Sequence, residues 1–275
     1  NWQTLAQISQ SVLDGTPYWR AYQNRLLGPA IIAAFDAVTR DYGVALQLFN
    51  FLGLLAQNLL LFALARAADA GRAAALLFCC LWSLAFLGLQ DYYFYPWDIL
   101  DILILTFFAF SLVNERWLAW SVLLYPVALL NRESALFLPL GLVLLLLARI
   151  SVEGFRRGGR YYALRFTAGV AAILAGAAYT KFIRDVLFVT TGGDTDPEHR
   201  VLGNHVYFGP NLHQLLVDNW GSLNALVSLL VIGGSLWCVV LFFRNRDAGL
   251  RAGYALFLAM VYCVLMFGMV NEARL

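Results

Sequence analysis

Apolar stretches separated by short polar segments dominate the chain. Eight of them approach the ~20 residues that an α-helix needs to cross a bilayer: 43–66, 72–89, 99–114, 117–131, 134–150, 166–189, 222–243 and 252–271. Pro126 and Pro139 lie inside the fourth and fifth stretches, where kinks are expected. The pattern predicts an all-α protein, a polytopic transmembrane helical bundle with about eight spans.

Two segments near the N-terminus are predicted to be interfacial helices. Residues 2–13 space Trp2, Leu5, Ile8 and Val12 at helical intervals, which suggests an amphipathic helix lying on the outer membrane surface. Residues 26–38 form a second apolar segment of this kind. No internal repeat interrupts the chain, so one transmembrane domain over 1–275 is expected, with 1–42 as an outer interfacial segment and 190–221 as an outer loop.

Composition supports a membrane protein. Hydrophobic residues make up 61% of the chain and charged residues 13%, against about 25% charged in a typical soluble domain. The mean hydropathy is +0.69. The chain begins at Asn1 without Met and ends just after a polar cluster, so the native protein is expected to extend at both ends.

The charges divide between the two sides of the predicted bundle. Loops 66–72, 114–117, 149–165 and 244–251 hold eleven basic and four acidic residues, whereas the opposite side holds eight basic and thirteen acidic ones. Because cytoplasmic loops are enriched in arginine and lysine, the arginine-rich side is predicted to be cytoplasmic. The arginine-rich segment 151–165 is expected to lie on anionic lipid headgroups.

Carboxylates gather at the start of the third span. Asp91, Asp98 and Asp101 fall within residues 90–101, together with three tyrosines that include Tyr95. Asp98 has a simple interpretation as a helix cap, because a carboxylate is favoured at a helix N-terminus. Asp101 lies about one turn into an apolar span, where a charged group usually faces a cavity or a partner. The aromatic residues also fit an interfacial belt.

Other predicted outer segments add arginines, acids and histidines. Arg132 and Glu133 share a tight turn, where they could neutralise each other or where Arg132 could bind a lipid phosphate. The candidates for binding the substrate or its lipid phosphate are Arg25, Tyr95, Asp101, Arg132, Glu133, His199, His205, Glu272 and Arg274. The two histidines and nearby acids could bind a divalent metal, but the glycines of segment 190–220 favour a loop that covers a substrate. No cofactor is firmly implied.

An outward cavity lined with carboxylates and arginines suits sugar transfer from a lipid-linked donor. Arginines would hold the phosphate leaving group, and a carboxylate would take the proton of the acceptor hydroxyl. Nucleotide-sugar donors are cytoplasmic, so an outward site favours a polyprenyl-phosphate sugar. The sequence contains no Walker motif, no dinucleotide fingerprint and no nucleophile elbow.

The chain resembles the GT-C class of polytopic glycosyltransferases, in particular the bacterial GT-C-like membrane proteins. The resemblance is carried by four short motifs in order, at residues 22–29 (YQNRLLGP), 95–98 (YPWD), 131–139 (NRESALFLP) and 271–275 (NEARL). It implies a polyprenyl-phosphate-sugar donor and a catalytic carboxylate in the first outer loop. The only acid in residues 1–30 is Asp14, so Asp91 and Asp98 are the next catalytic candidates.

Two other functions stay open. The chain could be a non-catalytic accessory or structural subunit of a larger membrane complex, with its aromatic and arginine clusters binding lipids and protein partners. It could also be a lipid or solute transporter, which would favour charges in mid-span and inverted repeats. In each case the expected location is the bacterial cytoplasmic membrane, and no feature points to nucleic acid.

Overall fold

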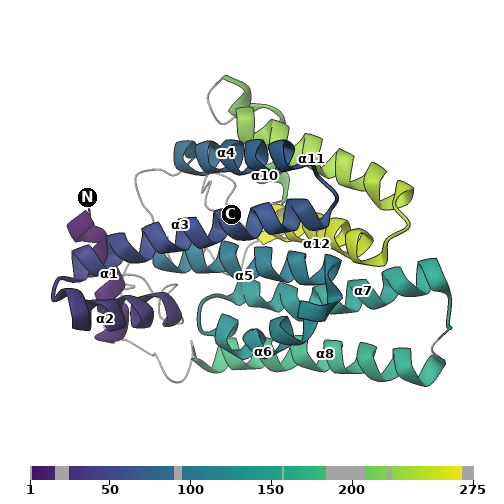
Figure 1. Ribbon diagram of the computed structural model, residues 1–275, viewed down its shortest axis with the longest axis horizontal. Helices are drawn as coiled ribbons and strands as arrows, with labels where there is room; N and C mark the ends of the chain where they lie inside the picture. The colour runs from purple at the N-terminus through teal and green to yellow at the C-terminus, as the bar shows by residue number, and fades with distance from the viewer. Residues whose placement is uncertain are drawn as a thin grey trace. The chain divides into compact units, whose positions relative to one another are not determined.

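The computed structural model describes residues 2–15, 25–89, 95–156, 158–183, 208–221 and 225–267 (Figure 1). Within these ranges every regular element is a helix. The all-α class predicted from the apolar pattern is therefore confirmed. The candidate residues Asp91, His199, His205, Glu272 and Arg274 lie outside the described residues.

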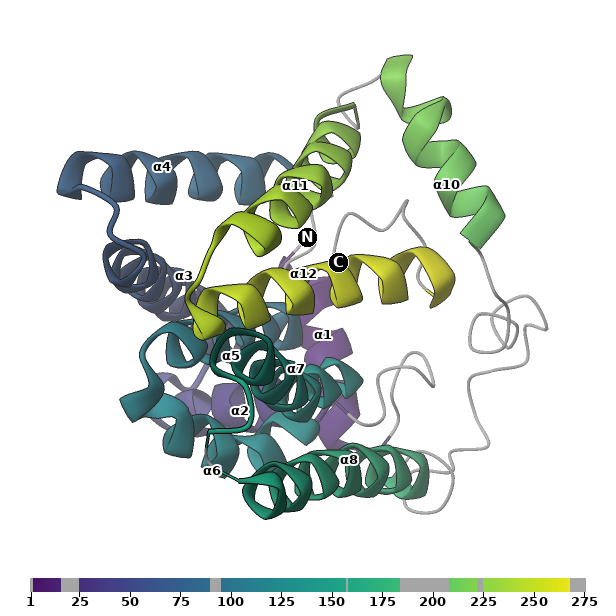
Figure 2. The ribbon, with the colours of Figure 1, turned by 90° about the vertical axis from the view of Figure 1, so that its right-hand side faces the viewer.

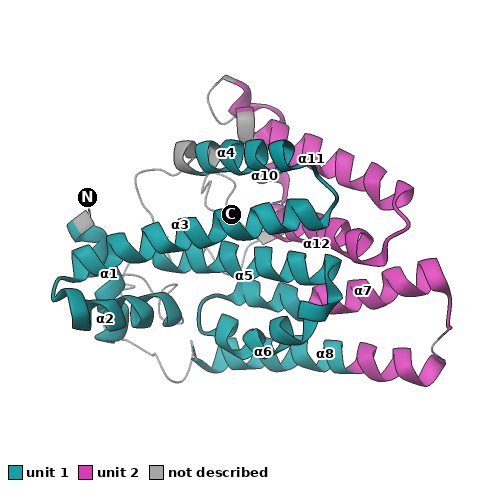
Figure 3. Cartoon of the chain, in the orientation of Figure 1, with its two compact units in different colours: residues 1–139, 168–195 teal, residues 140–167, 196–275 magenta. Residues whose placement is uncertain are grey.

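The chain divides into two compact units (Figure 3). Unit 1 comprises residues 1–139 and 168–195, and unit 2 comprises residues 140–167 and 196–275. Each unit is described by itself below. The single domain expected over 1–275 stays a prediction.

Unit 1 begins with α1 (Trp2–Leu13) and α2 (Leu27–Thr39), which pack against α3 (Tyr42–Ala67). The apolar side of α1 belongs to the core of this unit, since Leu5, Ile8 and Val12 are at most 8% exposed. The helices predicted at 2–13 and 26–38 are confirmed. The apolar side of α1 packs on neighbouring helices of unit 1, whereas the location of this helix at the outer membrane surface stays a prediction.

The pair α3 and α5 (Pro96–Val113) forms the centre of unit 1. The Asp41 carboxylate caps α3 by accepting hydrogen bonds from the Gly43 and Val44 backbone N–H groups. Gly53 faces Ile99 so closely that a Cβ atom at residue 53 would overlap the Ile99 side chain. α4 (Arg72–Leu89) packs on α3, and the Ser83 hydroxyl donates to Asn58 Oδ1 at 2.9 Å.

A short 3₁₀ turn, η2 (Glu115–Trp117), leads into α6 (Leu118–Leu129), which packs on α5. A second 3₁₀ turn, η3 (Glu133–Leu136), leads into α7 (Phe137–Glu153), and α8 (Gly159–Phe182) follows. The part of α8 within unit 1 meets α6, because the Tyr125 hydroxyl donates to the Ala172 carbonyl at 2.8 Å.

Unit 2 contains α10 (Phe208–Leu216), η6 (Asp218–Gly221), α11 (Ala225–Arg244) and α12 (Ala248–Phe267) (Figure 2). α11 and α12 pack along each other. Asn211 Nδ2 donates to the Leu265 carbonyl at 2.9 Å, and Asn219 Nδ2 donates to Ser228 Oγ at 3.0 Å. These buried amides attach the segment before α11 to both long helices.

Four helical segments are long and apolar enough to cross a membrane, among the residues described: Tyr42–Ala67, Pro96–Val113, Glu133–Glu153 and Gly159–Phe182. The predicted count of eight spans is not supported. Every predicted range overlaps a helix, but α6 has only 12 residues, about 18 Å of helix against a ~30 Å hydrocarbon core. Four shorter apolar helical stretches, of 10–17 residues, are not counted among these spans: Leu27–Thr39, Arg72–Leu84, Ser228–Arg244 and Ala248–Cys263.

Candidate functional site

Polar side chains from three segments of unit 1 meet at the beginning of α5. Pro96 starts this helix, and Asp98 lies in its first turn. The positive end of the helix dipole stabilises a carboxylate at this position. Asp101 follows one turn later, and the turn between α6 and η3 supplies the partners of both acids. We call Arg25, Asp98, Asp101, Arg132 and Ser134 the polar cluster.

The first acid forms an ion pair across this turn. Arg132 Nη1 donates to Asp98 Oδ1 at 3.0 Å. The Asp98 side chain is 5% exposed and that of Arg132 is 16% exposed. The prediction paired Arg132 with its neighbour Glu133 or with a lipid phosphate, whereas the fold brings it to an acid 34 positions earlier.

The second acid has a hydroxyl partner. Ser134 Oγ donates a hydrogen bond to Asp101 Oδ1. The charges of Arg132 and Arg25 both act on this carboxylate. Two carboxylates and two guanidinium groups therefore belong to the polar cluster.

Backbone contacts hold the three segments together. The Leu26 and Leu27 N–H groups donate to the Leu130 carbonyl at 2.8 and 3.1 Å. Asn131, which is fully buried, donates from Nδ2 to the Trp97 carbonyl at 2.8 Å. Gly28 packs against the start of α5, where a Cβ atom would lie 3.0 Å from Pro96 Cβ. The positions of the charged groups thus depend on a rigid backbone frame.

Aromatic rings lie beside the charges. The Tyr95 and Trp97 rings stack with centroids 4.9 Å apart, and both side chains are buried. The Arg25 guanidinium lies 5.3 Å from the centroid of the Trp97 ring, within cation–π range. Tyr95 was predicted to bind substrate, and the structure places its ring in this buried stack.

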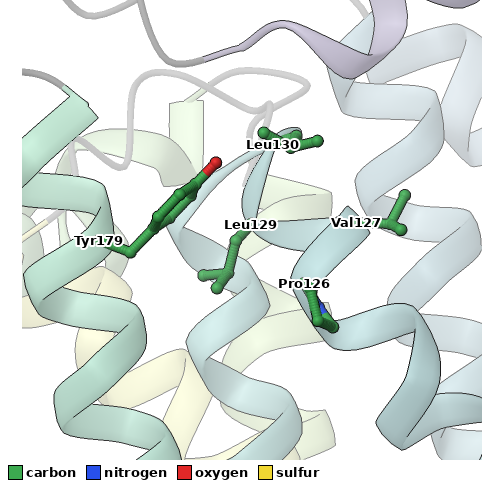
Figure 4. Close-up of a pocket in the computed structure, with 5 residues that line it drawn as sticks. All are labelled: Pro126, Val127, Leu129, Leu130 and Tyr179. Carbon is green, nitrogen blue, oxygen red and sulfur yellow. The ribbon is translucent and has the colours of Figure 1, made fainter. Parts of the chain in front are cut away.

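An apolar cavity of about 310 Å³ adjoins the turn that carries Arg132 (Figure 4). Pro126, Val127, Leu129 and Leu130 line it from the end of α6, and the Tyr179 side chain of α8 lies beside them. Leu130 is two residues from Arg132, so one turn of the chain contributes to both the cavity and the polar cluster.

Asp14 and Glu133 were also predicted as site residues. Asp14 is exposed just after α1, and its charge acts on Tyr42 of α3. It is not among the groups whose charges act on Asp101. Glu133 is half-buried at the first position of η3. Within the ranges that the structure describes, no group of three His, Cys, Asp or Glu side chains could hold a metal ion.

The sequence-based reasoning missed the two pairings that define the polar cluster, Asp98 with Arg132 and Asp101 with Ser134. A signal for them was present. Asp98 and Asp101 lie at the start of one predicted span, and Arg132 and Ser134 lie at the start of another, on the same predicted side of the membrane. Segments on one side can meet, but only the packing of α5 against α6 and η3 selects these partners.

No protein-family model matches the chain, and neither a curated protein nor a solved structure matches it. The resemblance to the GT-C class therefore stays a prediction that depends on the four short motifs.

Proposed function

We propose that the chain is a membrane glycosyltransferase that uses a polyprenyl-phosphate-linked sugar at the outer face of a bacterial cytoplasmic membrane. The observation that carries this proposal is the polar cluster of two acids and two arginines, in which Arg132 lies in a turn that also lines an apolar cavity through Leu130. A lipid-linked donor needs both a cationic contact for its phosphate and an apolar surface for its chain.

In the proposed reaction the acceptor hydroxyl oxygen attacks the anomeric carbon of the sugar. The bond between this carbon and the phosphate oxygen breaks, and polyprenyl phosphate leaves with the electron pair. Asp98 takes the hydroxyl proton as general base, while Arg132 and Arg25 stabilise the negative charge on the phosphate. The single displacement inverts the anomeric centre.

Among the acids that the structure describes, Asp98 is the better candidate for the base. It lies beside Arg132, the cation that is proposed to hold the leaving group. Asp14 is a weaker candidate because it is exposed at the end of α1 and its charge acts on a different residue. In the bound state, phosphate would replace the Asp98 carboxylate as a partner of Arg132 and so release the base.

The test is to incubate the purified full chain with a panel of polyprenyl-phosphate sugars and to measure released polyprenyl phosphate. We expect Asp98→Asn to lower turnover by roughly 10²-fold or more, because a general base contributes about that much. Asp14→Asn is the matched control and should retain turnover. Absence of turnover with every donor, from a folded chain, would overturn the proposal.

A non-catalytic role in a larger membrane complex is the second candidate. It is favoured by the ion pair itself, since Asp98 and Arg132 neutralise each other in a nearly buried position. In this case the role of the pair is structural: it joins α5 to the turn after α6. A subunit of this kind would retain its cellular function when Asp14 and Asp91 are replaced by Asn and when Asp98 and Arg132 are replaced together by Leu and Met, because that double change leaves no uncompensated charge.

A further inference from the structure

Unit 2 carries a second charged surface, separate from the polar cluster. It is formed by residues 149–165, between and around the ends of α7 and α8, and by residues 244–251, between α11 and α12. Arg251 Nη1 donates to Ser151 Oγ at 3.1 Å, so the two segments lie together. We call the exposed arginines of this region, which are Arg156, Arg160, Arg165, Arg244 and Arg246, the basic surface.

The charge of this region is strongly unbalanced. The two segments contain eight arginines and two acidic residues, Glu153 and Asp247. The Asp247 carboxylate accepts a hydrogen bond from the Leu250 N–H at 2.8 Å and so caps the start of α12. In the described part of the chain, no ion pair involves an arginine of the basic surface.

Exposed aromatic side chains lie beside these arginines. Phe155 is 64% exposed and Phe243 is 74% exposed. The Phe155 ring meets Tyr162 edge to face at a centroid distance of 5.7 Å, and the Arg165 guanidinium lies 4.3 Å from the centroid of the Tyr161 ring. Arginines next to exposed aromatic rings at helix ends are typical of a membrane–water interface.

Arg251 and Tyr162, which are not part of the basic surface, join the two segments and order their ends. Arg251 Nε donates to the Asn245 carbonyl at 2.6 Å, and its guanidinium lies 5.7 Å from the centroid of the Phe242 ring. The Tyr162 hydroxyl donates to the Gly154 carbonyl at 3.3 Å. One arginine therefore holds the segments together, while the exposed ones keep their guanidinium groups available for an external anion.

We propose that the basic surface binds the headgroups of anionic phospholipids, with phosphatidylglycerol as the model lipid. Arginine can donate two parallel hydrogen bonds to a phosphate, and a negative lipid surface attracts each nearby basic residue. The exposed phenylalanines would enter the boundary between headgroups and acyl chains. This inference depends on the membrane character of the chain and not on the proposed sugar transfer.

The test uses the full chain in detergent, titrated with fluorescent dioleoyl phosphatidylglycerol or with dioleoyl phosphatidylcholine bearing the same fluorophore. We expect tighter binding of the anionic lipid, weakened by added salt. The variant Arg156→Gln/Arg246→Gln should lose this preference by roughly fivefold for each arginine removed. The control Arg40→Gln/Lys181→Gln removes two exposed charges of unit 1 and should bind like the wild type.

A second measurement needs no variant. A photoreactive phosphatidylglycerol should label residues 149–165 and 244–251 of the wild-type chain, as read by peptide mass spectrometry. Equal affinity for the two lipids, or labelling only outside these segments, would overturn the proposal. The same is true if the control weakens binding as much as the Arg156→Gln/Arg246→Gln variant.

Discussion

At the scale of single residues, the pair Asp98–Arg132 holds two opposite charges in a nearly buried position. Its two side chains are 5% and 16% exposed, so each charge has lost most of its contact with solvent and depends on the other for compensation. Removal of one partner from a buried pair is costly because the remaining charge is left without compensation, whereas replacement of both by apolar groups can be nearly neutral.

We therefore expect Arg132→Met to lower the free energy of unfolding by ~3 kcal/mol. The double variant Asp98→Leu/Arg132→Met should recover a large part of that loss, because it leaves no uncompensated charge. Thermal unfolding in one detergent measures both, with Asp14→Asn as an exposed control. If Asp98→Leu lowers the free energy of unfolding as much in the Arg132→Met variant as in the wild-type protein, the two residues are not coupled.

At the scale of helices, small residues set how closely unit 1 packs. Gly53 of α3 faces Ile99 of α5, and Gly176 of α8 faces Tyr125 of α6 and Leu136 of η3, each without room for a Cβ atom. Close approach at small residues is a common way for membrane helices to associate, since lipid provides little hydrophobic drive for their contact. The hydrogen bond from Gln57 Nε2 to Thr106 Oγ1, at 2.8 Å, reinforces the α3–α5 pair.

Gly53→Ala should destabilise the protein by ~1–3 kcal/mol, the usual cost of overpacking. Gly233→Ala is the matched control, because Gly233 lies within α11 and no atom comes within 4 Å of a Cβ placed there. The control should be neutral or slightly stabilising, since alanine favours helix more than glycine does. The measurement is thermal unfolding of both variants. Equal destabilisation by the two substitutions would contradict the packing argument.

At the scale of the whole molecule, helix length and the distribution of charges bear on how the chain crosses the membrane. The charge pattern predicts an orientation, and four helical segments meet the criteria for a span among the residues described. The 20 residues of α11 and α12 correspond to about 30 Å of helix, which matches the hydrocarbon core.

Single cysteines in a cysteine-free background test this topology. A membrane-impermeant thiol reagent added to intact cells should label a cysteine that replaces Arg40. It should label cysteines that replace Asp69 or Asp247 only after the membrane is opened, because these residues lie in the loops predicted to be cytoplasmic. Labelling of the residue-69 and residue-247 cysteines in intact cells would show that the predicted orientation is wrong.

The sequence by itself determined the helical class and the approximate positions of the apolar helices, because these depend on local periodicity. It also identified four charged residues near the ends of apolar helices as site candidates, because a charge there usually has a partner or faces a cavity. These residues are Arg25, Asp98, Asp101 and Arg132.

Only the tertiary structure decided which charges meet. It paired Arg132 with Asp98 instead of with the adjacent Glu133, and it separated the exposed Asp14 from the ion pair. It also placed the apolar side of α1 in the core of unit 1. An amphipathic pattern shows that a helix has an apolar side, but not whether lipid or protein covers it. Likewise, the partner of a charge depends on contacts between segments that are distant in the sequence, which local patterns do not encode.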